Sequence, residues 1–172
     1  WLKAGGPPRR AAAGAMSAGA VKRCRPFLQR AEELGAHDPV VAHYCRVHAV
    51  EILAKAYKAG EKDPEVVSLL TAEMTKAEDA KKVLDLSQGR EAMQVFALQI
   101  FDSADAKDRA GCGDAGVAHQ FYVASQFLDA CAQFFDGELP PDLQEKSKYA
   151  KYRAMQIRDS VRQGVSPAPP PA

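Results

Sequence analysis

Apolar residues recur along most of this chain at spacings of three and four, the period of an α-helix with one buried face. The clearest case lies between residues 114 and 135, where six apolar positions keep this spacing without a break: Val117, Phe121, Ala124, Leu128, Cys131 and Phe135. The period of two that is typical of a half-buried strand is nearly absent. The pattern therefore predicts an all-α fold.

Turn and capping residues divide the pattern into six predicted helices. Asp-Pro pairs at Asp38-Pro39 and at residues 63–64 are strong start signals, because Asp caps a helix N-terminus and Pro suits its first position. Gly35 and Gly60 are typical stop signals. The helices are predicted at residues 20–34, 38–59, 63–84, 90–106, 114–135 and 142–163.

The same spacing predicts which positions face inward. On the second helix one apolar stripe contains Val41, Cys45, His48 and Ile52. On the third helix the stripe contains Val67, Leu70, Met74, Ala77 and Leu84. On the sixth helix it contains Ala150, Ala154, Ile157 and Val161.

A faint internal repeat suggests that the six helices form two related modules. The segments "VAHYCRV" at 41–47 and "VAHQFYV" at 117–123 match at four of seven positions, and each lies near the start of a middle helix. We expect one three-helix module at residues 18–87 and a second at 88–165. Residues 1–17 are expected to be a disordered extension, and residues 166–172 the start of a proline-rich linker within a longer protein.

Charge and composition narrow the classes of partner. The chain has 172 residues and a net charge of +1, but residues 32–172 alone carry a balance of −6. A mildly acidic folded part disfavours nucleic acid, because phosphate contacts need a basic surface. No apolar run reaches the length of a membrane span, so direct membrane insertion is not expected. Four scattered cysteines without a C-x-x-C pair favour a reducing compartment, by default the cytoplasm.

Three histidines and a cysteine, His37, His43, Cys45 and His48, raise the possibility of zinc. At 100° per residue the side chains of His43 and Cys45 point to nearly opposite sides of a helix, so the group cannot supply four convergent ligands. Cys112, between two glycines, is the best candidate nucleophile, but no signature of a cysteine enzyme surrounds it. We expect no metal, no cofactor, no catalytic residue and no enzymatic activity.

Three stretches together resemble one known family. They are "HDPVVAHYCRVHA", "DAKDRAGCGDAGVAHQFYVASQFLD" and "KYAKYRAMQIRDSVRQGVSP", and they occur in the family's order between about residues 20 and 167. The chain thereby resembles the Vta family, also called LYST-interacting proteins, which regulate the ESCRT machinery. His43 and Tyr152 depart from the family's usual tyrosine and tryptophan, but both keep a ring. The positions that carry the resemblance are Asp38, Pro39, Tyr44, Cys45, Arg46, Asp108, Arg109, Ala110, Gly111, Phe121, Tyr122, Lys148, Tyr149 and Tyr152.

The resemblance implies two tandem three-helix modules like MIT (microtubule-interacting and transport) domains. It implies a non-enzymatic adaptor that binds C-terminal tail helices of ESCRT-III subunits in multivesicular body sorting. A separate C-terminal domain, absent from this chain, would regulate the AAA ATPase that disassembles ESCRT-III. The implied location is the cytoplasm, with peripheral recruitment to the endosomal membrane.

One surface of the first module is the expected binding site. MIT-like modules hold an amphipathic helix in a groove between two of their own helices. The third helix offers Met74 as an adaptable floor and Ala77 as a small neighbour, flanked by charges. The expected site contains Leu70, Glu73, Met74, Ala77, Glu78 and Lys81.

Two other classes of protein remain as alternatives. An unrelated helical-repeat interaction module would have the tetratricopeptide pattern, which is absent. A helical-bundle metalloenzyme would need inward Glu-x-x-His pairs, and no histidine here has a glutamate three positions before it.

Overall fold

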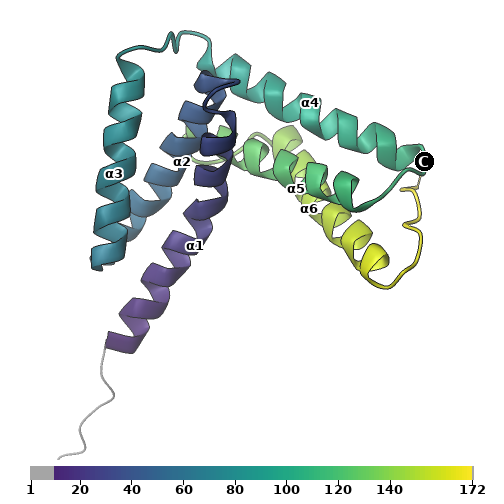
Figure 1. Ribbon diagram of the computed structural model, residues 1–172, viewed down its shortest axis with the longest axis horizontal. Coiled ribbons are helices and arrows are strands. Elements are labelled where there is room, and N and C mark those ends of the chain that lie inside the picture. Colours follow the sequence, from purple (N-terminus) through teal and green to yellow (C-terminus); the bar gives the residue numbers. More distant parts are fainter. Residues whose placement is uncertain (1–9, 172) are drawn as a thin grey trace, which may run out of the picture. The chain divides into compact units, whose positions relative to one another are not determined.

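The computed structural model describes the backbone of residues 10–171 and the side chains from residue 19 onward. Every regular element in this part of the chain is a helix, which confirms the all-α prediction. Figure 1 shows the helices in chain order: α1 (Arg10–Leu34), α2 (Pro39–Lys58), α3 (Pro64–Lys81), α4 (Gly89–Arg109), α5 (Ala115–Ala130), the short 3-10 helix η1 (Cys131–Phe134) and α6 (Pro141–Arg162).

The helices group into two compact units, one ending at Leu84 and the other beginning at Asp85. Unit 1 contains α1, α2 and α3, and unit 2 contains α4, α5, η1 and α6. In both units the middle helix packs along both of its neighbours, whereas the outer helices touch each other much less. The boundary lies three residues before the one expected between residues 87 and 88.

The two middle helices begin in the same way. The Asp38 side chain accepts a hydrogen bond from the backbone N–H of Val41 at 3.1 Å, and Asp114 accepts one from the N–H of Val117 at 2.8 Å. Pro39 is the first residue of α2, as its sequence predicts. These caps begin the two segments that carry the faint sequence repeat, so each copy of the repeat starts a middle helix.

Four boundaries differ from the expectation by three residues or more, and one of them is the end of α4 at Arg109 instead of residue 106. Helix α1 begins at Arg10, ten residues before the expected start, because the alanine-rich segment that precedes Ala20 has high helix propensity. Part of the expected disordered extension is therefore helical, and residues 1–9 lie outside the described residues. Helix α5 ends at Ala130, and the predicted continuation to Phe135 is a 3-10 turn instead. Helix α3 ends at Lys81, before Leu84.

The core of unit 1 is built around α2, where Val41, Cys45, Ala49 and Leu53 are fully buried. On α3 the predicted stripe is wrong at two positions, because the side chains of Val67 and Met74 are 38% and 47% exposed. The buried face of α3 instead contains Val66, Leu70, Glu73 and Ala77. A glutamate therefore occupies a position in the interior that the apolar pattern does not predict.

The core of unit 2 is aromatic. The rings of Phe101, Phe121 and Tyr149 lie about 6 Å from one another, in edge-on and tilted arrangements that suit aromatic pairs. The predicted α5 stripe is confirmed from Val117 to Cys131. On α6 the predicted stripe holds until Ile157, but Val161 is 42% exposed.

Candidate docking surfaces

Arg46 on α2 joins the three helices of unit 1. Its Nε donates to Glu73 Oε2 on α3 at 3.0 Å, and its Nη2 donates to Glu32 Oε1 on α1 at 3.1 Å. The Nζ of Lys76 donates to the second carboxylate oxygen of Glu73 at 2.9 Å. These bonds explain why Glu73 can be buried, since a buried carboxylate needs charged or polar partners.

A second buried ion pair joins the outer helices of unit 2. Arg153 on α6 holds Asp108 on α4 through two hydrogen bonds of 2.7 Å, and the side chains are 8% and 1% exposed. One turn away, Asp105 on α4 accepts hydrogen bonds from Arg109 at 2.7 Å and from the Tyr149 hydroxyl at 3.3 Å. Burial, and then the Asp105 carboxylate, raise the pKa of Tyr149.

The remaining residues that carry the resemblance have structural or surface positions. Cys45 and Phe121 are fully buried, and Gly111 has a φ of +76° that ends α4 in a turn. Tyr44 is half-buried on α2. The exposed members are Ala110, Tyr122, Lys148 and Tyr152. Cys45, Phe121 and Gly111 therefore have structural positions, and the exposed tyrosines are members that a partner could contact.

The histidines and cysteines give no sign of metal or nucleophilic chemistry. Within the described residues no group of three or more His, Cys, Asp and Glu side chains could hold a metal ion. His43 is 2% exposed, and burial, followed by the charges of Lys81 and Arg46, lowers its pKa. Burial raises the pKa of Cys131 to about 12 and also raises that of Cys24, which makes both thiols poor nucleophiles.

No described helix combines the length and the apolar character that crossing a membrane requires.

The six residues expected to bind a partner lie on two sides of α3. Leu70, Glu73 and Ala77 face the interior of unit 1, with 9%, 6% and 6% exposure. Met74, Glu78 and Lys81 are exposed, and the last two form an ion pair of 3.1 Å. Both charges act on the pKa of His43, so this exposed side of α3 lies toward α2. The six do not form one continuous surface.

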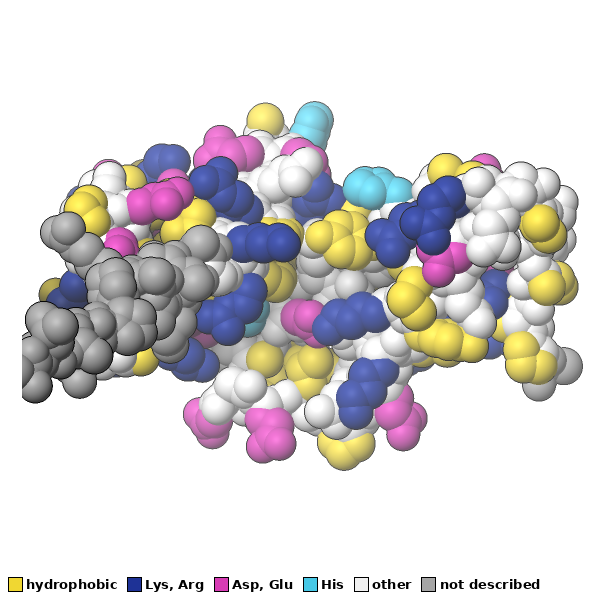
Figure 2. Space-filling view, turned by 90° about the horizontal axis from the view of Figure 1, so that it is seen from below, with side chains coloured by type: hydrophobic (Ala, Val, Ile, Leu, Met, Phe, Trp, Pro, Cys, Tyr) yellow, Lys and Arg dark blue, Asp and Glu magenta, His cyan; other side chains and the backbone are white. Residues whose placement is uncertain are grey.

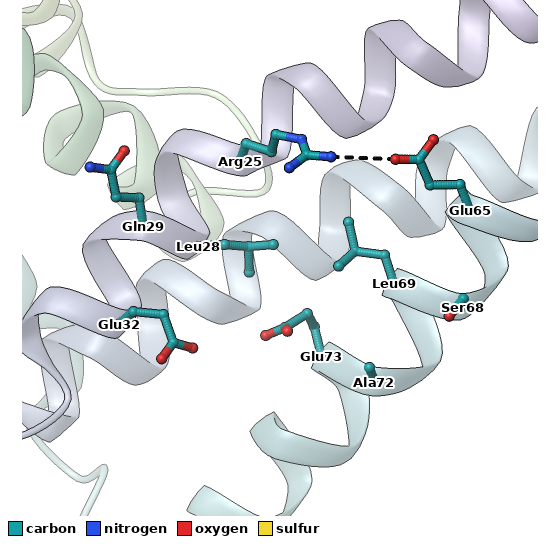
Figure 3. Close-up of a pocket in the computed structure, with 9 residues that line it drawn as sticks. All are labelled: Arg25, Leu28, Gln29, Glu32, Glu65, Ser68, Leu69, Ala72 and Glu73. Atoms are coloured by element: carbon teal, nitrogen blue, oxygen red, sulfur yellow. Dashed lines mark hydrogen bonds and ion pairs between the residues drawn. The ribbon is translucent and has the colours of Figure 1, made fainter.

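A different hollow of unit 1 lies between α1 and α3 (Figure 3). It has a volume of about 610 Å³. Its lining residues are Arg25, Leu28, Gln29, Glu32, Glu65, Ser68, Leu69, Ala72 and Glu73. Arg25 and Glu65 form an ion pair of 3.3 Å across it, and both side chains are about two-thirds exposed. The other two carboxylates, of Glu32 and Glu73, already bind Arg46.

In unit 2 an apolar groove of about 620 Å³ lies between α5 and α6. Tyr122, Met155 and Val161 line it with 46%, 48% and 42% exposure, a large apolar area for exposed positions. Lys151, Arg158 and His119 supply its polar edges, and no carboxylate lines it. The remaining lining residues are Ala115, Ala118 and Ala154. Figure 2 shows one face of the molecule, on which exposed hydrophobic side chains lie beside basic ones.

A smaller hollow of about 520 Å³ lies between α4 and α6, and Phe101, Tyr149, Lys146, Asp105 and Arg109 are among its lining residues. The ammonium group of Lys146 lies 4.8 Å from the centre of the Phe101 ring. Because basic and acidic groups alternate here and bind each other, this hollow has no single charge preference.

The α5–α6 groove was not among the sites expected from sequence. Its residues follow helical spacing on each helix, as Ala115, Ala118 and Tyr122 do on α5. This spacing is visible in the sequence, but rows of small and charged residues are equally typical of a solvent-exposed helix face. Only the packing of α5 against α6 brings the two rows together.

Comparison with known proteins places these features in one family of sequences. The family described as Vta1 like matches residues 23–163. The chain is 41% identical over 145 residues to the Arabidopsis thaliana protein named homolog of mammalian LYST-interacting protein 5, covering 84% of this chain and 34% of that protein. It is 32% identical over 153 residues to the Homo sapiens vacuolar protein sorting-associated protein VTA1 homolog, covering 85% and 48%. The chain spans about a third to a half of the length of these relatives.

A solved structure has the same fold. The crystal structure of the Saccharomyces cerevisiae Vta1 N-terminal domain superposes with a TM-score of 0.69 at 14% identity, covering 84% of this chain and 98% of that one. The agreement extends over nearly all of the yeast domain, so it includes the helices of both units.

Proposed function

This chain belongs to the Vta1 family of vacuolar protein sorting proteins, and from that premise we propose that it is a non-enzymatic docking module of the ESCRT machinery. Its two units would act as MIT-like modules that bind C-terminal tail helices of ESCRT-III subunits. In a longer protein, a separate domain would regulate the AAA ATPase that disassembles ESCRT-III. The module would be cytoplasmic and would reach the endosomal membrane through these partners.

The α5–α6 groove is the single observation that most supports this proposal. Exposed Tyr122, Met155 and Val161 offer apolar contacts along two parallel rows, which suits the i, i+3, i+4 and i+7 anchors of an amphipathic helix. Alanines on both helices leave room for the larger side chains of a ligand. Lys151 is already paired with Asp129 at 2.7 Å, so Arg158 is the cation that favours a tail helix with a carboxylate beside its apolar stripe.

The exposed side of α3 is a second candidate surface. Met74 is 47% exposed, and helical spacing puts it on the same side of α3 as Glu78 and Lys81. A flexible, exposed methionine suits a surface that adapts to a partner. Glu78 and Lys81 already pair with each other, so this surface has no single charge preference and would select a tail by its apolar anchors.

The test is a binding series against peptides of ESCRT-III C-terminal tails, measured by calorimetry. We expect Met155→Asp to weaken the binding of the tail that unit 2 recognises by at least about 2 kcal/mol, the size of a binding hot spot. This loss corresponds to a roughly 30-fold higher dissociation constant. Met74→Asp should do the same for a tail that unit 1 binds. Val95→Asp is the matched control, because Val95 on α4 is 53% exposed and lies outside the groove.

Circular dichroism must show unchanged helicity in all three variants. If no tail binds the unaltered chain, the proposal is wrong. If Met155→Asp binds every tail as tightly as Val95→Asp does, the α5–α6 groove is not the site. If only Met74→Asp loses affinity, the binding site lies on unit 1.

A further inference from the structure

The segment that follows α6 is docked on unit 2. Figure 1 shows this segment turning back from the end of α6 to finish beside the end of α4. The turn is made at Gly164, whose φ of +70° favours glycine. The N–H of Gly164 bonds to the carbonyl of Val161 at 3.1 Å, and the N–H of Val165 bonds to that of Ser160 at 3.0 Å. This pair of bonds is the Schellman motif, which ends a helix and reverses the chain.

Two contacts hold the reversed segment. The Nη2 of Arg153, already bound to Asp108, donates a hydrogen bond to the carbonyl of Ala168 at 3.0 Å. On the other side Pro167 lies against Gly113, so closely that a Cβ built on Gly113 would be 3.2 Å from the Cβ of Pro167. Pro167 and Pro170 are correspondingly half-buried.

These contacts connect three stretches that are far apart in the sequence. Asp108 and Gly113 lie at the end of α4 and in the following loop, Arg153 lies on α6, and Pro167 follows α6. The carboxylate of Asp108 is also within 3.4 Å of a Cβ on Gly113. We propose that residues 165–171 are a strap that fastens the α4–α5 loop to α6, rather than the free start of a linker.

The strap has a consequence for the end of α6. The last turns of this helix extend beyond Arg153, and they carry Met155, Arg158 and Val161 on the side that faces the α5–α6 groove. The strap leaves α6 at Gly164 and is held by Arg153, which lies earlier on the same helix, so we expect it to limit the fraying of these turns. The strap thereby positions the α6 wall of the α5–α6 groove. This positioning role rests on the proposed function, whereas the existence of the strap does not.

The strap is tested by amide nuclear relaxation in the whole chain. The steady-state ¹⁵N nuclear Overhauser effects of Ser166 and Ala168 should equal those of the α6 interior. Arg153→Lys keeps a positive charge against Asp108 but loses the planar group that reaches two acceptors, so both amides should become mobile. Gly113→Val places a branched side chain where Pro167 packs and should release the strap while residue 153 stays arginine. Because the new Cβ also lies 3.4 Å from Asp108 Oδ1, the Arg153 Nε–H resonance checks that the Arg153–Asp108 pair is kept.

A disulfide fixes the position of the strap independently. In the background Cys112→Ser, the pair Gly113→Cys and Pro167→Cys has a Cβ separation of 3.2 Å, a few tenths of an ångström below the roughly 3.5–4.5 Å of natural disulfides, which a small shift of the strap corrects. The two cysteines should oxidise to an intramolecular disulfide. Adding Arg153→Lys should slow the formation of this disulfide roughly ten-fold, because a free segment lies beside the loop only part of the time.

Four results decide between a strap and a free segment. The strap is established if the amides of Ser166 and Ala168 are rigid in the unaltered chain and become mobile in Gly113→Val. The disulfide must also form more slowly when Arg153→Lys is added. Mobile amides in the unaltered chain overturn it, as do amides that stay rigid in both variants. If Arg153→Lys unfolds unit 2, Gly113→Val alone gives the answer. Faster amide exchange at Arg158–Arg162 in Gly113→Val supports the positioning role, and unchanged exchange there overturns that role whether or not tails bind.

Discussion

A comparison of Glu73 with Glu65 can measure how burial changes the contribution of an ion pair to stability, because both residues lie on the same helix. Both are glutamates of α3 that bind an arginine of another helix, at 3.0 Å for Glu73 with Arg46 and 3.3 Å for Glu65 with Arg25. The first pair has side-chain exposures of 8% and 14%, and the second of 65% and 68%. The change to glutamine removes the charge and keeps the shape in each case.

The expected losses differ because of solvent. Removing one partner of a fully buried pair costs about 3–5 kcal/mol, since the other charge stays buried without compensation. Arg46 keeps Glu32 as a second partner and remains partly exposed, which reduces the expected cost of Glu73→Gln to about 2–3 kcal/mol. For Glu65→Gln we expect about 0–1 kcal/mol, the usual range of exposed pairs.

The measurement is native-state amide exchange of α2, in peptides that contain Ala49 and Leu53. These fully buried residues report the opening of unit 1, so the unfolding of unit 2 does not enter the result. Glu73→Gln should accelerate their exchange by roughly 30- to 150-fold, which is the expected free energy converted at 1.4 kcal/mol per factor of ten. Equal effects of the two substitutions, or no effect of Glu73→Gln, would refute the reasoning.

Three further predictions concern stability and reactivity. The pKa of His43 is lowered in the folded unit, so as the pH falls the unfolded chain takes up a proton at His43 first. The stability of unit 1 should therefore fall as the pH drops below the ordinary histidine pKa of 6.5. His43→Leu should flatten this pH dependence in urea titrations. Cys112 is exposed whereas Cys24, Cys45 and Cys131 are buried, so one thiol per folded chain should react rapidly with an aromatic disulfide reagent, and Cys112→Ser should abolish that phase. Phe121 is fully buried between Phe101 and Tyr149, so Phe121→Ala should destabilise unit 2 by about 3–5 kcal/mol in amide exchange, and an effect below about 1 kcal/mol would contradict the packing described.

The family and the helices could be predicted from sequence because their signals are local. The caps at Asp38 and Asp114 act within three residues of the chain, and helix type follows from neighbours along it. The α5 stripe from Val117 to Cys131 is also correct, but because that helix is covered on both sides its buried surface extends beyond the stripe to Ser125 and Gln126.

The positions of charged residues depended on the tertiary structure. Glu73 is buried and Met74 is exposed, the reverse of what hydrophobicity alone suggests, because Arg46 reaches Glu73 from another helix. A rule based on one helix contains no information about a partner 27 residues away. The same reason applies to Arg153, which replaces an apolar residue in the interior because Asp108 lies opposite on α4.

The sequence by itself determined the helices, their caps and the family, since each depends on residues that are close together in the chain. The tertiary structure decided which helix faces meet. The α5–α6 groove exists because two modest rows of residues become neighbours only when the helices pack. The segment after α6, which is proline-rich enough to predict a free linker, is held because Arg153 and Gly113 offer it a hydrogen bond and a space that no local pattern encodes.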